Sequence, residues 1–465
     1  MGSIVVCGAG VVGLSAAMML AGDGHEVTVL EADPQGAPTT PEEAWASWDR
    51  KGVKQFHQPH NLFARFRRIC DDELPGLTER LVEAGCVWVD YVASMPPTIS
   101  DRTPRQGDAE LRFVTGRRPV VESVVAAAAE DEPGVTVRRG VRIAELLPGS
   151  SALAGVPHVA GVRTTNDGEI RADLVVDATG RRSRPAEWLA PLGARAPEVD
   201  AEDKGFVYYT RYFTGSALPQ RLGRDLSPMG SFSVLTLHGD NDTWSVTAFT
   251  TTGDQPLKAL RDADAFTRVV SACPLQAHWL DGTPISDVLC IAGVMDRYHR
   301  HVVDGRPVAT GLLPVGDAWA CTNPSAGRGI SVGMIHAQVL RHVVRDHLDD
   351  PAALVEAWHE RTESLVAPYY WNQVAADRAR VAEMTALREG REPPPPADAT
   401  RRFLTASRYD ADVFRALLET VLCTALPQEV LARPDLQRRI ERLGDEPLSS
   451  TPGPDREQLL ALLAG

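Results

Sequence analysis

Three closely spaced glycines near the N-terminus, in the order G-x-G-x-x-G, are the residues whose spacing points most directly to chemistry. The stretch consists of Gly8, Gly10, Val11, Val12 and Gly13. A short β-branched run precedes it, an Ala-rich helical pattern follows it, and the next predicted strand closes on Glu31 and Ala32. This strand–helix–strand order is the context in which such a loop binds a dinucleotide.

Each part of the motif has a physical reason. The first glycine allows a tight turn, the second lets the backbone approach a diphosphate, and the third lets the helix pack closely on the sheet. The free N–H groups and the dipole at the helix start favour phosphate. Glu31 would accept both ribose hydroxyls and repel a 2′-phosphate, which disfavours NADP at this site. The motif alone does not separate FAD from NAD.

Two later segments resemble parts of the same kind of site. Asp177-Ala-Thr-Gly180 ends a buried strand at 174–176, and Gly316-Asp317 ends another at 311–315. A Gly-rich helix start then follows the second strand, and the residues of interest there are Asp317, Pro324, Gly327, Gly329 and Ile330.

Together the three segments resemble the FAD motifs of the para-hydroxybenzoate hydroxylase-like (group A) flavoprotein monooxygenases. The resemblance covers residues 1 to about 380 and implies non-covalent FAD. It implies that Asp317 holds the ribityl chain and that Pro324, Gly327 and Gly329 lie beside the isoalloxazine. A helix N-terminus there would stabilise the negative charge that reduction places on the ring.

The resemblance also assigns roles outside these glycines. Arg118, which starts a helix next to Arg117, is similar to the family arginine that contacts the FAD phosphates, and Val141 lies near the strand that binds adenine. The middle motif usually reads D-G in hydroxylases. The D-A-T-G form, ending in Gly180, also occurs in flavin-dependent halogenases and geranylgeranyl reductase-like enzymes, and the source of reducing equivalents therefore stays open. In hydroxylases this loop also contacts NAD(P)H, a role that would fall to Asp177 and Arg181.

The patterns along the chain predict an α/β protein of three parts. We expect a Rossmann-like, glutathione reductase-type FAD-binding domain from residues 1–190 plus 286–350. An inserted antiparallel substrate domain should span 191–285, and a C-terminal helical region 351–465. Within the first part, 34–59 reads as a long loop, and 135–137 with 141–147 as a pair of strands.

The antiparallel segment 206–213 alternates in a way that separates two faces. One face carries Tyr208 and Tyr212, and the other carries Tyr209 and Phe213. We expect one face to line a substrate pocket, with Tyr208 and Tyr212 as candidate substrate contacts, and the other to pack against helices. The sequence does not assign a catalytic residue.

The amino-acid composition limits the classes of partner that the protein is expected to bind. Lys and Arg number 48 and Asp and Glu 62, giving a net charge of −14, which disfavours nucleic acid or anionic lipid. No apolar run approaches the ~20 residues of a membrane span, and the N-terminus lacks signal-peptide features. The seven cysteines are scattered without C-x-x-C spacing. His57 and His60 have H-x-x-H spacing without an evident third ligand, and we expect no metal. A reduced, cytoplasmic enzyme, monomeric or homodimeric, is therefore expected.

The preferred function is an FAD-dependent monooxygenase of specialised metabolism that hydroxylates or epoxidises an aromatic or polycyclic small molecule. NAD(P)H would be the reductant and O₂ the oxidant, through a flavin C4a-hydroperoxide. One alternative is an FAD-dependent reductase or dehydrogenase. Another is a two-component monooxygenase or halogenase that receives reduced flavin from a partner flavin reductase. A third is a flavin-binding redox sensor.

Overall fold

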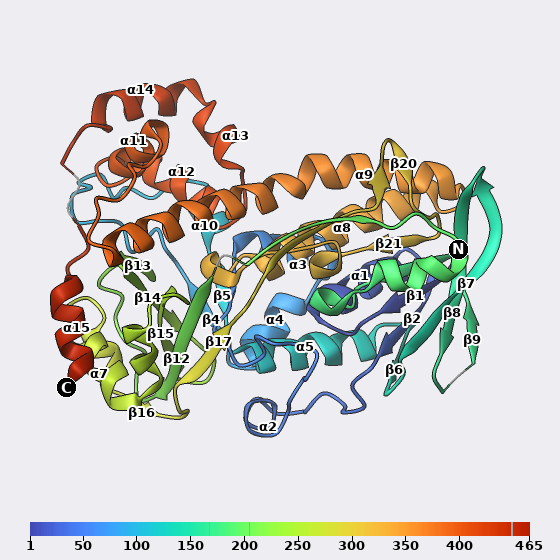
Figure 1. Ribbon diagram of the computed structural model, residues 1–465, viewed down its shortest axis with the longest axis horizontal. Coiled ribbons are helices and arrows are strands. Elements are labelled where there is room, and N and C mark those ends of the chain that lie inside the picture. Colours follow the sequence, from blue (N-terminus) through green and yellow to red (C-terminus); the bar gives the residue numbers. More distant parts are fainter. Residues whose placement is uncertain (167, 204, 448–449) are drawn as a thin grey trace.

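A parallel β-sheet forms the centre of one half of the molecule in the computed structural model, which describes residues 1–166, 168–203, 205–447 and 450–465 (Figure 1). The sheet consists of five strands in the spatial order Leu312–Pro314 (β21), Leu174–Asp177 (β10), Ser3–Cys7 (β1), Glu26–Glu31 (β2) and Val135–Arg139 (β6).

The two faces of this sheet carry different layers, because successive side chains of a strand point to opposite faces. Ile4 and Val6 of β1 pack among helices, whereas Val5 and Cys7 pack against a second, antiparallel sheet. The helices are Val11–Gly22 (α1), Arg118–Asp131 (α5) and Gly329–His347 (α8), and the second sheet consists of Ile143–Leu153 (β7), Val156–Thr164 (β8) and Glu169–Arg171 (β9). The predicted Rossmann-like α/β class is confirmed.

Two local expectations are wrong. The strands expected as a pair near 135–147 separate: β6 pairs with β2 in the parallel sheet, while β7 pairs with β8. The stretch 34–59 is not all loop, because Pro41–Ala46 form a short helix (α2). Thr40 caps this helix by accepting a hydrogen bond from the Glu43 N–H, 3.2 Å away, and Pro41 occupies its first turn.

A small three-stranded sheet and two helices follow this segment. The sheet has the order β3–β5–β4, and the elements are Asn61–Leu62 (β3), Ala64–Glu73 (α3), Leu77–Glu83 (α4), Val87–Val89 (β4) and Phe113–Thr115 (β5). α3 packs against α8, which joins this part to the parallel-sheet half.

The antiparallel sheet expected in the middle of the chain is present. Its long strands are joined by a hairpin at 239–242, in which Asn241 and Asp242 have φ of 47° and 53°, as a tight hairpin turn requires. The strands are Phe206–Thr214 (β12), Leu226–Met229 (β13), Phe232–His238 (β14), Thr243–Thr251 (β15), Thr283–Pro284 (β16) and Leu289–Ala292 (β17). The domain boundaries themselves stay a prediction.

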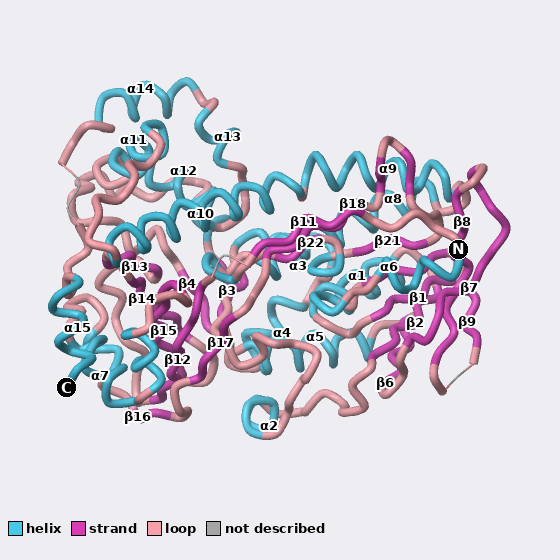
Figure 2. The backbone as a smooth tube through the Cα atoms, in the orientation of Figure 1, coloured by secondary structure: helices cyan, strands magenta, loops and turns pink. Residues whose placement is uncertain are grey.

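A narrow sheet and a long helix connect the two halves (Figure 2). The sheet is formed by Glu198–Glu202 (β11), Asp296–Arg300 (β18) and Ala320–Cys321 (β22). Pro351–Leu365 (α9) packs on α8, and Ala367–Arg388 (α10) then runs from there to the antiparallel sheet (Figure 1).

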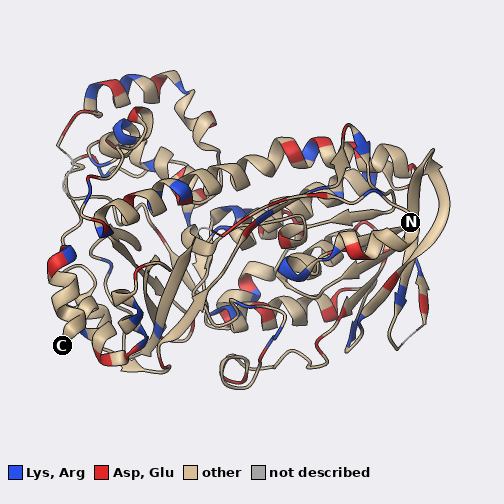
Figure 3. Cartoon of the chain, in the orientation of Figure 1, with Lys and Arg blue, Asp and Glu red and all other residues tan. Residues whose placement is uncertain are grey.

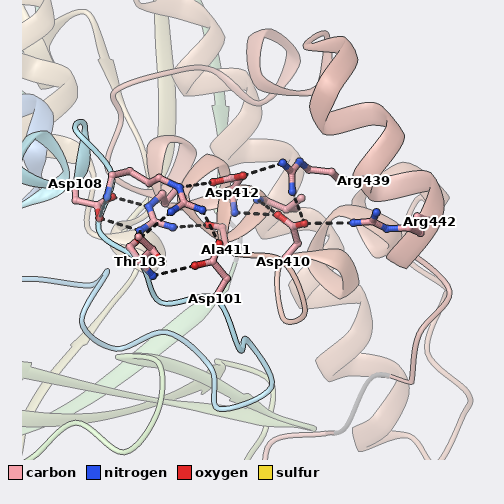
Figure 4. Close-up of polar contacts among 11 residues, drawn as sticks. Asp101, Thr103, Asp108, Asp410, Ala411, Asp412, Arg439 and Arg442 are labelled. Atoms are coloured by element: carbon pink, nitrogen blue, oxygen red, sulfur yellow. Dashed lines mark hydrogen bonds and ion pairs between the residues drawn. The ribbon is translucent and has the colours of Figure 1, made fainter.

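The C-terminal helices contact both earlier parts. Leu459 in the last helix is buried in the core of the antiparallel sheet. Ion pairs hold the helix Ala411–Val421 to the segment 101–108; Arg415 donates to Asp108 with 2.8 Å between Nη2 and Oδ2 (Figure 4). The helices are Asp398–Ala406 (α11), Ala411–Val421 (α12), Pro427–Leu431 (α13), Pro434–Leu443 (α14) and Arg456–Ala464 (α15).

Acidic and basic side chains are interspersed over the helices in the view of Figure 3. Among the described residues, no helix combines the length and the apolar character that crossing a bilayer would need. No group of three potential metal-ligating side chains occurs among these residues either.

Candidate flavin site

The three motifs meet at one edge of the parallel sheet. The strand register pairs Cys7 with Leu30 on one side and with Asp177 on the other, and Asp177 in turn pairs with Pro314. The residues that follow these strands therefore leave the sheet at the same level. In open α/β sheets this carboxyl edge is where ligands bind.

The N-terminal glycine loop leaves room for a diphosphate. Gly8 has φ of +114°, and a Cβ on Gly13 would lie 2.2 Å from the Gly8 carbonyl oxygen, so both positions require glycine. A Cβ on Gly10, in contrast, would meet no atom of the described residues within 4 Å. Gly10 is the N-cap of α1, and among those residues no side chain caps this helix end or places an acid in its first turn. The structure thus offers unpaired N–H groups beside open space, which fits a diphosphate.

Val11 and Val12 position this helix. Val11 is buried in the core, and Val12 contacts α8, where a Cβ on Gly333 would lie 2.4 Å from its Cγ2. The close approach of α1 and α8 brings the starts of the two helices together.

Glu31 is where the motif places it, at the end of β2. Its Oε2 accepts from the Ala9 N–H, 2.9 Å away, and from Arg50; its Oε1 accepts from the Asp33 N–H. Ala32, the next residue, is exposed.

Arg50 is a residue that sequence reasoning missed. Its Nη1 donates to the Ala9 carbonyl at 2.8 Å and to Glu122 Oε2 at 2.6 Å, and its side chain is 6% exposed. It therefore lies against the glycine loop itself. In the sequence, Arg50 could have been noticed only as a basic residue just before residues 52–60, a stretch rich in His and Gln.

Arg118 starts α5 and faces the same network. Its Nε donates to Glu122 Oε1 at 2.6 Å, and its Nη1 lies 3.2 Å from His60 Nε2. Burial and the Arg118 charge lower the pKa of His60 to about 3. His60 Nδ1 contacts the Gln58 carbonyl at 2.7 Å, so both ring nitrogens are engaged within the protein. The neighbouring Arg117 instead pairs with Asp240 of the hairpin, with 2.6 Å between Nη2 and Oδ2.

The middle motif forms a tight turn beside the third. The buried Asp177 accepts from the Thr179 N–H and from the Ser183 hydroxyl, so its carboxylate faces its own turn; burial raises its pKa. Gly180 opens a short 3₁₀ turn, and Arg181 Nε lies 3.2 Å from Asp317 Oδ2. The Asp317 side chain is 31% exposed, which leaves it reachable from solvent.

Val141 lies beside the end of β2, where its N–H donates to the Glu31 carbonyl at 2.9 Å. It follows β6 directly and is buried against the parallel sheet. Val141 lies between β6 and β7 rather than in the strand expected at 141–147, because β7 begins only at Ile143, and a contact of its backbone with adenine stays a prediction.

The third motif forms a second open helix start. Gly316 has φ of +57°, and its N–H donates to Nδ1 of the buried His336 on α8 at 3.0 Å, which fixes the turn that carries Asp317. A Cβ on Gly327 or Gly329 would meet nothing of the described chain within 4 Å. Among the described residues, no side chain caps α8. Pro324 lies in the short turn before this helix, and Ile330 is buried within its first turn.

The structure shows which face of β12 is turned toward the three motifs. Tyr209 and Phe213 pack into the core beneath the helices. On the other face, the Tyr208 hydroxyl donates to Asn323 Oδ1, and the Tyr212 ring lies 4.7 Å from the ring of Trp45. Tyr208 and Tyr212 thus contact segments of the parallel-sheet half.

Comparisons with known proteins agree with this geometry. The family of FAD-dependent oxidoreductases matches residues 3–91. This match confirms the expectation of an FAD-dependent oxidoreductase.

Relatives support the same fold over most of the chain. The Mycobacterium tuberculosis (strain ATCC 25618 / H37Rv) protein Rv3254 is 27% identical over 73% of this chain and 72% of its own. The digeranylgeranylglycerophospholipid reductase of Haloferax volcanii (strain DS2) is 24% identical over 80% of this chain and 83% of its own. Among solved structures, PqsL of Pseudomonas aeruginosa, described as a probable FAD-dependent monooxygenase, has a TM-score of 0.59. It covers 89% of this chain and 99% of its own at 16% identity.

Proposed function

We propose that this protein is an FAD-dependent monooxygenase that inserts one oxygen atom of O₂ into an aromatic or polycyclic small molecule. The observation that carries the proposal is the meeting of two uncapped helix starts, those of α1 and α8, at one sheet edge, with Tyr208 of β12 hydrogen-bonded to Asn323 just before α8. The fold likeness to PqsL supports the general kind of enzyme.

The residues of the three motifs suit both halves of FAD, the adenosine diphosphate and the flavin. Glu31 would bind the ribose of the adenosine, next to the backbone at Val141. The free N–H groups at the start of α1 would bind the diphosphate. Arg50, paired with Glu31 and Glu122, would hold the glycine loop beneath it. Arg118 is paired to the same Glu122.

The other half of the cofactor would lie along the third motif. Asp317 would hold the ribityl chain after exchanging its contact with Arg181. The backbone at Gly327 and Gly329 would lie beside the ring, where the start of α8 favours negative charge. A Cβ on Gly10, Gly327 or Gly329 would meet no described atom within 4 Å, which supports space for the diphosphate and for the ring.

FAD bound in this way would supply the electron transfer from NAD(P)H and the activation of O₂. The balanced reaction is RH + O₂ + NAD(P)H + H⁺ → ROH + H₂O + NAD(P)⁺. The protein's task is to keep water away from the reacting centre and to orient the substrate. The aromatic face of β12, with Tyr208 and Tyr212, provides such an apolar cover.

A groove of about 580 Å³ lies on the surface of α10. Val381 lines the groove and also packs against the cluster that contains Phe206 and Tyr208. Charged residues of both signs, among them Arg378 and Glu202, form its walls.

The decisive experiment measures flavin and oxygen together. Purified protein should be yellow and retain FAD on desalting, and Glu31→Ala should lose it. NADH or NADPH should reduce the flavin faster in the presence of an accepted member of a panel of phenols, naphthols and hydroxyanthraquinones. With ¹⁸O₂ the product should gain one labelled oxygen atom.

Other outcomes identify the alternatives. The similarity to a prenyl-lipid reductase favours a reductase as the second candidate, and anaerobic, NAD(P)H-dependent reduction of a substrate double bond would establish it. Turnover only when a separate flavin reductase is added would establish the partner-fed reaction. A cytoplasmic location and a monomeric or homodimeric state belong to the same proposal.

A further inference from the structure

The segment that would face the flavin ring, residues 323–327, is held from the antiparallel sheet on one side. Asn323 is 1% exposed and accepts a hydrogen bond at Oδ1 from the Tyr208 hydroxyl. Its Nδ2 donates to the Val294 carbonyl at 2.9 Å, and its N–H donates to Asp296 Oδ1 at 2.6 Å. The start of the segment is therefore fixed by three contacts.

The other side of the segment is held by α10, a helix that follows the last FAD motif. The Ser325 hydroxyl donates to Asp377 Oδ1. Gln373, one helical turn earlier, donates from Nε2 to Ser325 Oγ at 2.8 Å and to Asp377 Oδ1 at 3.1 Å. Asp377 is 2% exposed, so this contact is buried.

A buried carboxylate at this position acts over a distance, because the protein interior screens charge weakly. Burial raises the pKa of the Tyr208 hydroxyl, and the charges of Asp377 and Asp296 raise it further. Tyr208 contacts Asn323, and Asp377 contacts Ser325, two residues further along the same segment. A ring placed against that segment would feel the same charge.

We propose that Asp377 is a positioning residue of the flavin site, which fixes the segment 323–327 through Ser325 and disfavours the negative charge that the ring acquires on reduction. The role rests on the proposed function, since it requires FAD at this place. It gives α10 a part in the chemistry of the site besides packing.

Two variants separate the two parts of this role. Asp377→Asn keeps an oxygen that can accept from Ser325 and Gln373 but removes the charge. Ser325→Ala keeps the charge but removes the hydroxyl that links it to the segment. Glu383→Gln is the matched control, because Glu383 lies on the same helix with its side chain 41% exposed and paired to Arg380.

The readouts are the FAD content after desalting, the rate of FAD release and the midpoint potential of the bound flavin in a dithionite titration with reference dyes. Asp377→Asn should retain FAD like the wild type and shift the midpoint potential to a more positive value. Ser325→Ala should release FAD about tenfold faster, as loss of a charge-assisted hydrogen bond predicts. Glu383→Gln should change neither quantity.

A different result would contradict each part of the proposed role. An unchanged potential in FAD-loaded Asp377→Asn overturns the electrostatic role, and an unchanged release rate in Ser325→Ala overturns the positioning role. If wild-type protein takes up no FAD at all, the proposed function fails, and the role of Asp377 fails with it.

Discussion

Arg50 and Glu122 form a buried ion pair, with 2.6 Å between Nη1 and Oε2, although 72 residues separate them in the chain. Glu122 also accepts from Arg118, and Arg50 also contacts Glu31. Burial alone would raise the pKa of Glu122, but the two guanidinium groups outweigh it and hold the pKa below its usual value. Two carboxylates and two arginines thus neutralise one another beneath the glycine loop.

Removing Arg50 should destabilise the protein even without FAD. Arg50→Ala leaves Glu31 and Glu122 buried with one cation fewer, and breaking a buried pair costs about 3–5 kcal/mol of the free energy of unfolding. Urea unfolding of the FAD-free protein measures this. Arg80→Ala, which breaks an exposed pair with Asp131, is the control and should cost less than about 1 kcal/mol. Equal losses in the two variants would contradict the buried network.

Substitutions at two glycines of the N-terminal loop should differ in their effects on FAD affinity and on folding stability. Gly10→Ala places a methyl group in open space, so thermal stability without FAD should stay the same while FAD affinity falls about tenfold or more. Gly13→Ala places it 2.2 Å from the Gly8 oxygen and should destabilise the fold by about 1–3 kcal/mol. Calorimetry and flavin titration check both variants. A Gly10→Ala protein that binds FAD normally would remove the diphosphate assignment.

Local spacing was enough to predict some parts of the site but not others. The loop at Gly8 and the turn at Asp317 each depend on a few adjacent residues, and the strand register then brings them together. Arg50 and Asp377 act through partners far away in the chain, and no local pattern marks such contacts. Tyr208 and Tyr212 were candidate substrate contacts, but the sequence could not establish which face of β12 is turned toward the site, because both faces bear aromatic residues and the packing partners decide.

Buried histidines should make the protein less stable in acid. Burial lowers the pKa of His336 from 6.5 to about 3, so the unfolded chain binds a proton in this interval that the folded chain does not. The stabilisation is complete above about pH 6.5 and is lost as the pH falls toward 3, by up to about 1.4 kcal/mol per pH unit.

His336→Asn should reduce this slope, since an amide oxygen can still accept from the Gly316 N–H but does not titrate. His342→Asn is the control, because His342 lies on the same helix with its side chain 40% exposed. Chemical unfolding between pH 4 and pH 8 gives the slope for each protein. An identical slope in wild type and His336→Asn would show that His336 is not buried in the neutral form.

Tyr208 and Tyr212 should respond differently to loss of the hydroxyl, although both lie on the same face of β12. Tyr208→Phe leaves the buried Asn323 oxygen without its donor and should cost about 1–3 kcal/mol of unfolding free energy. The Tyr212 hydroxyl is buried and has no hydrogen-bond partner among the residues that the structure describes, so Tyr212→Phe should be neutral or slightly stabilising. If that hydroxyl instead serves the substrate, Tyr212→Phe will raise KM for the best phenol of the panel without loss of stability. A destabilised Tyr212→Phe with unchanged KM would assign Tyr212 to the core, because only a hydroxyl bonded within the protein costs stability when it is removed.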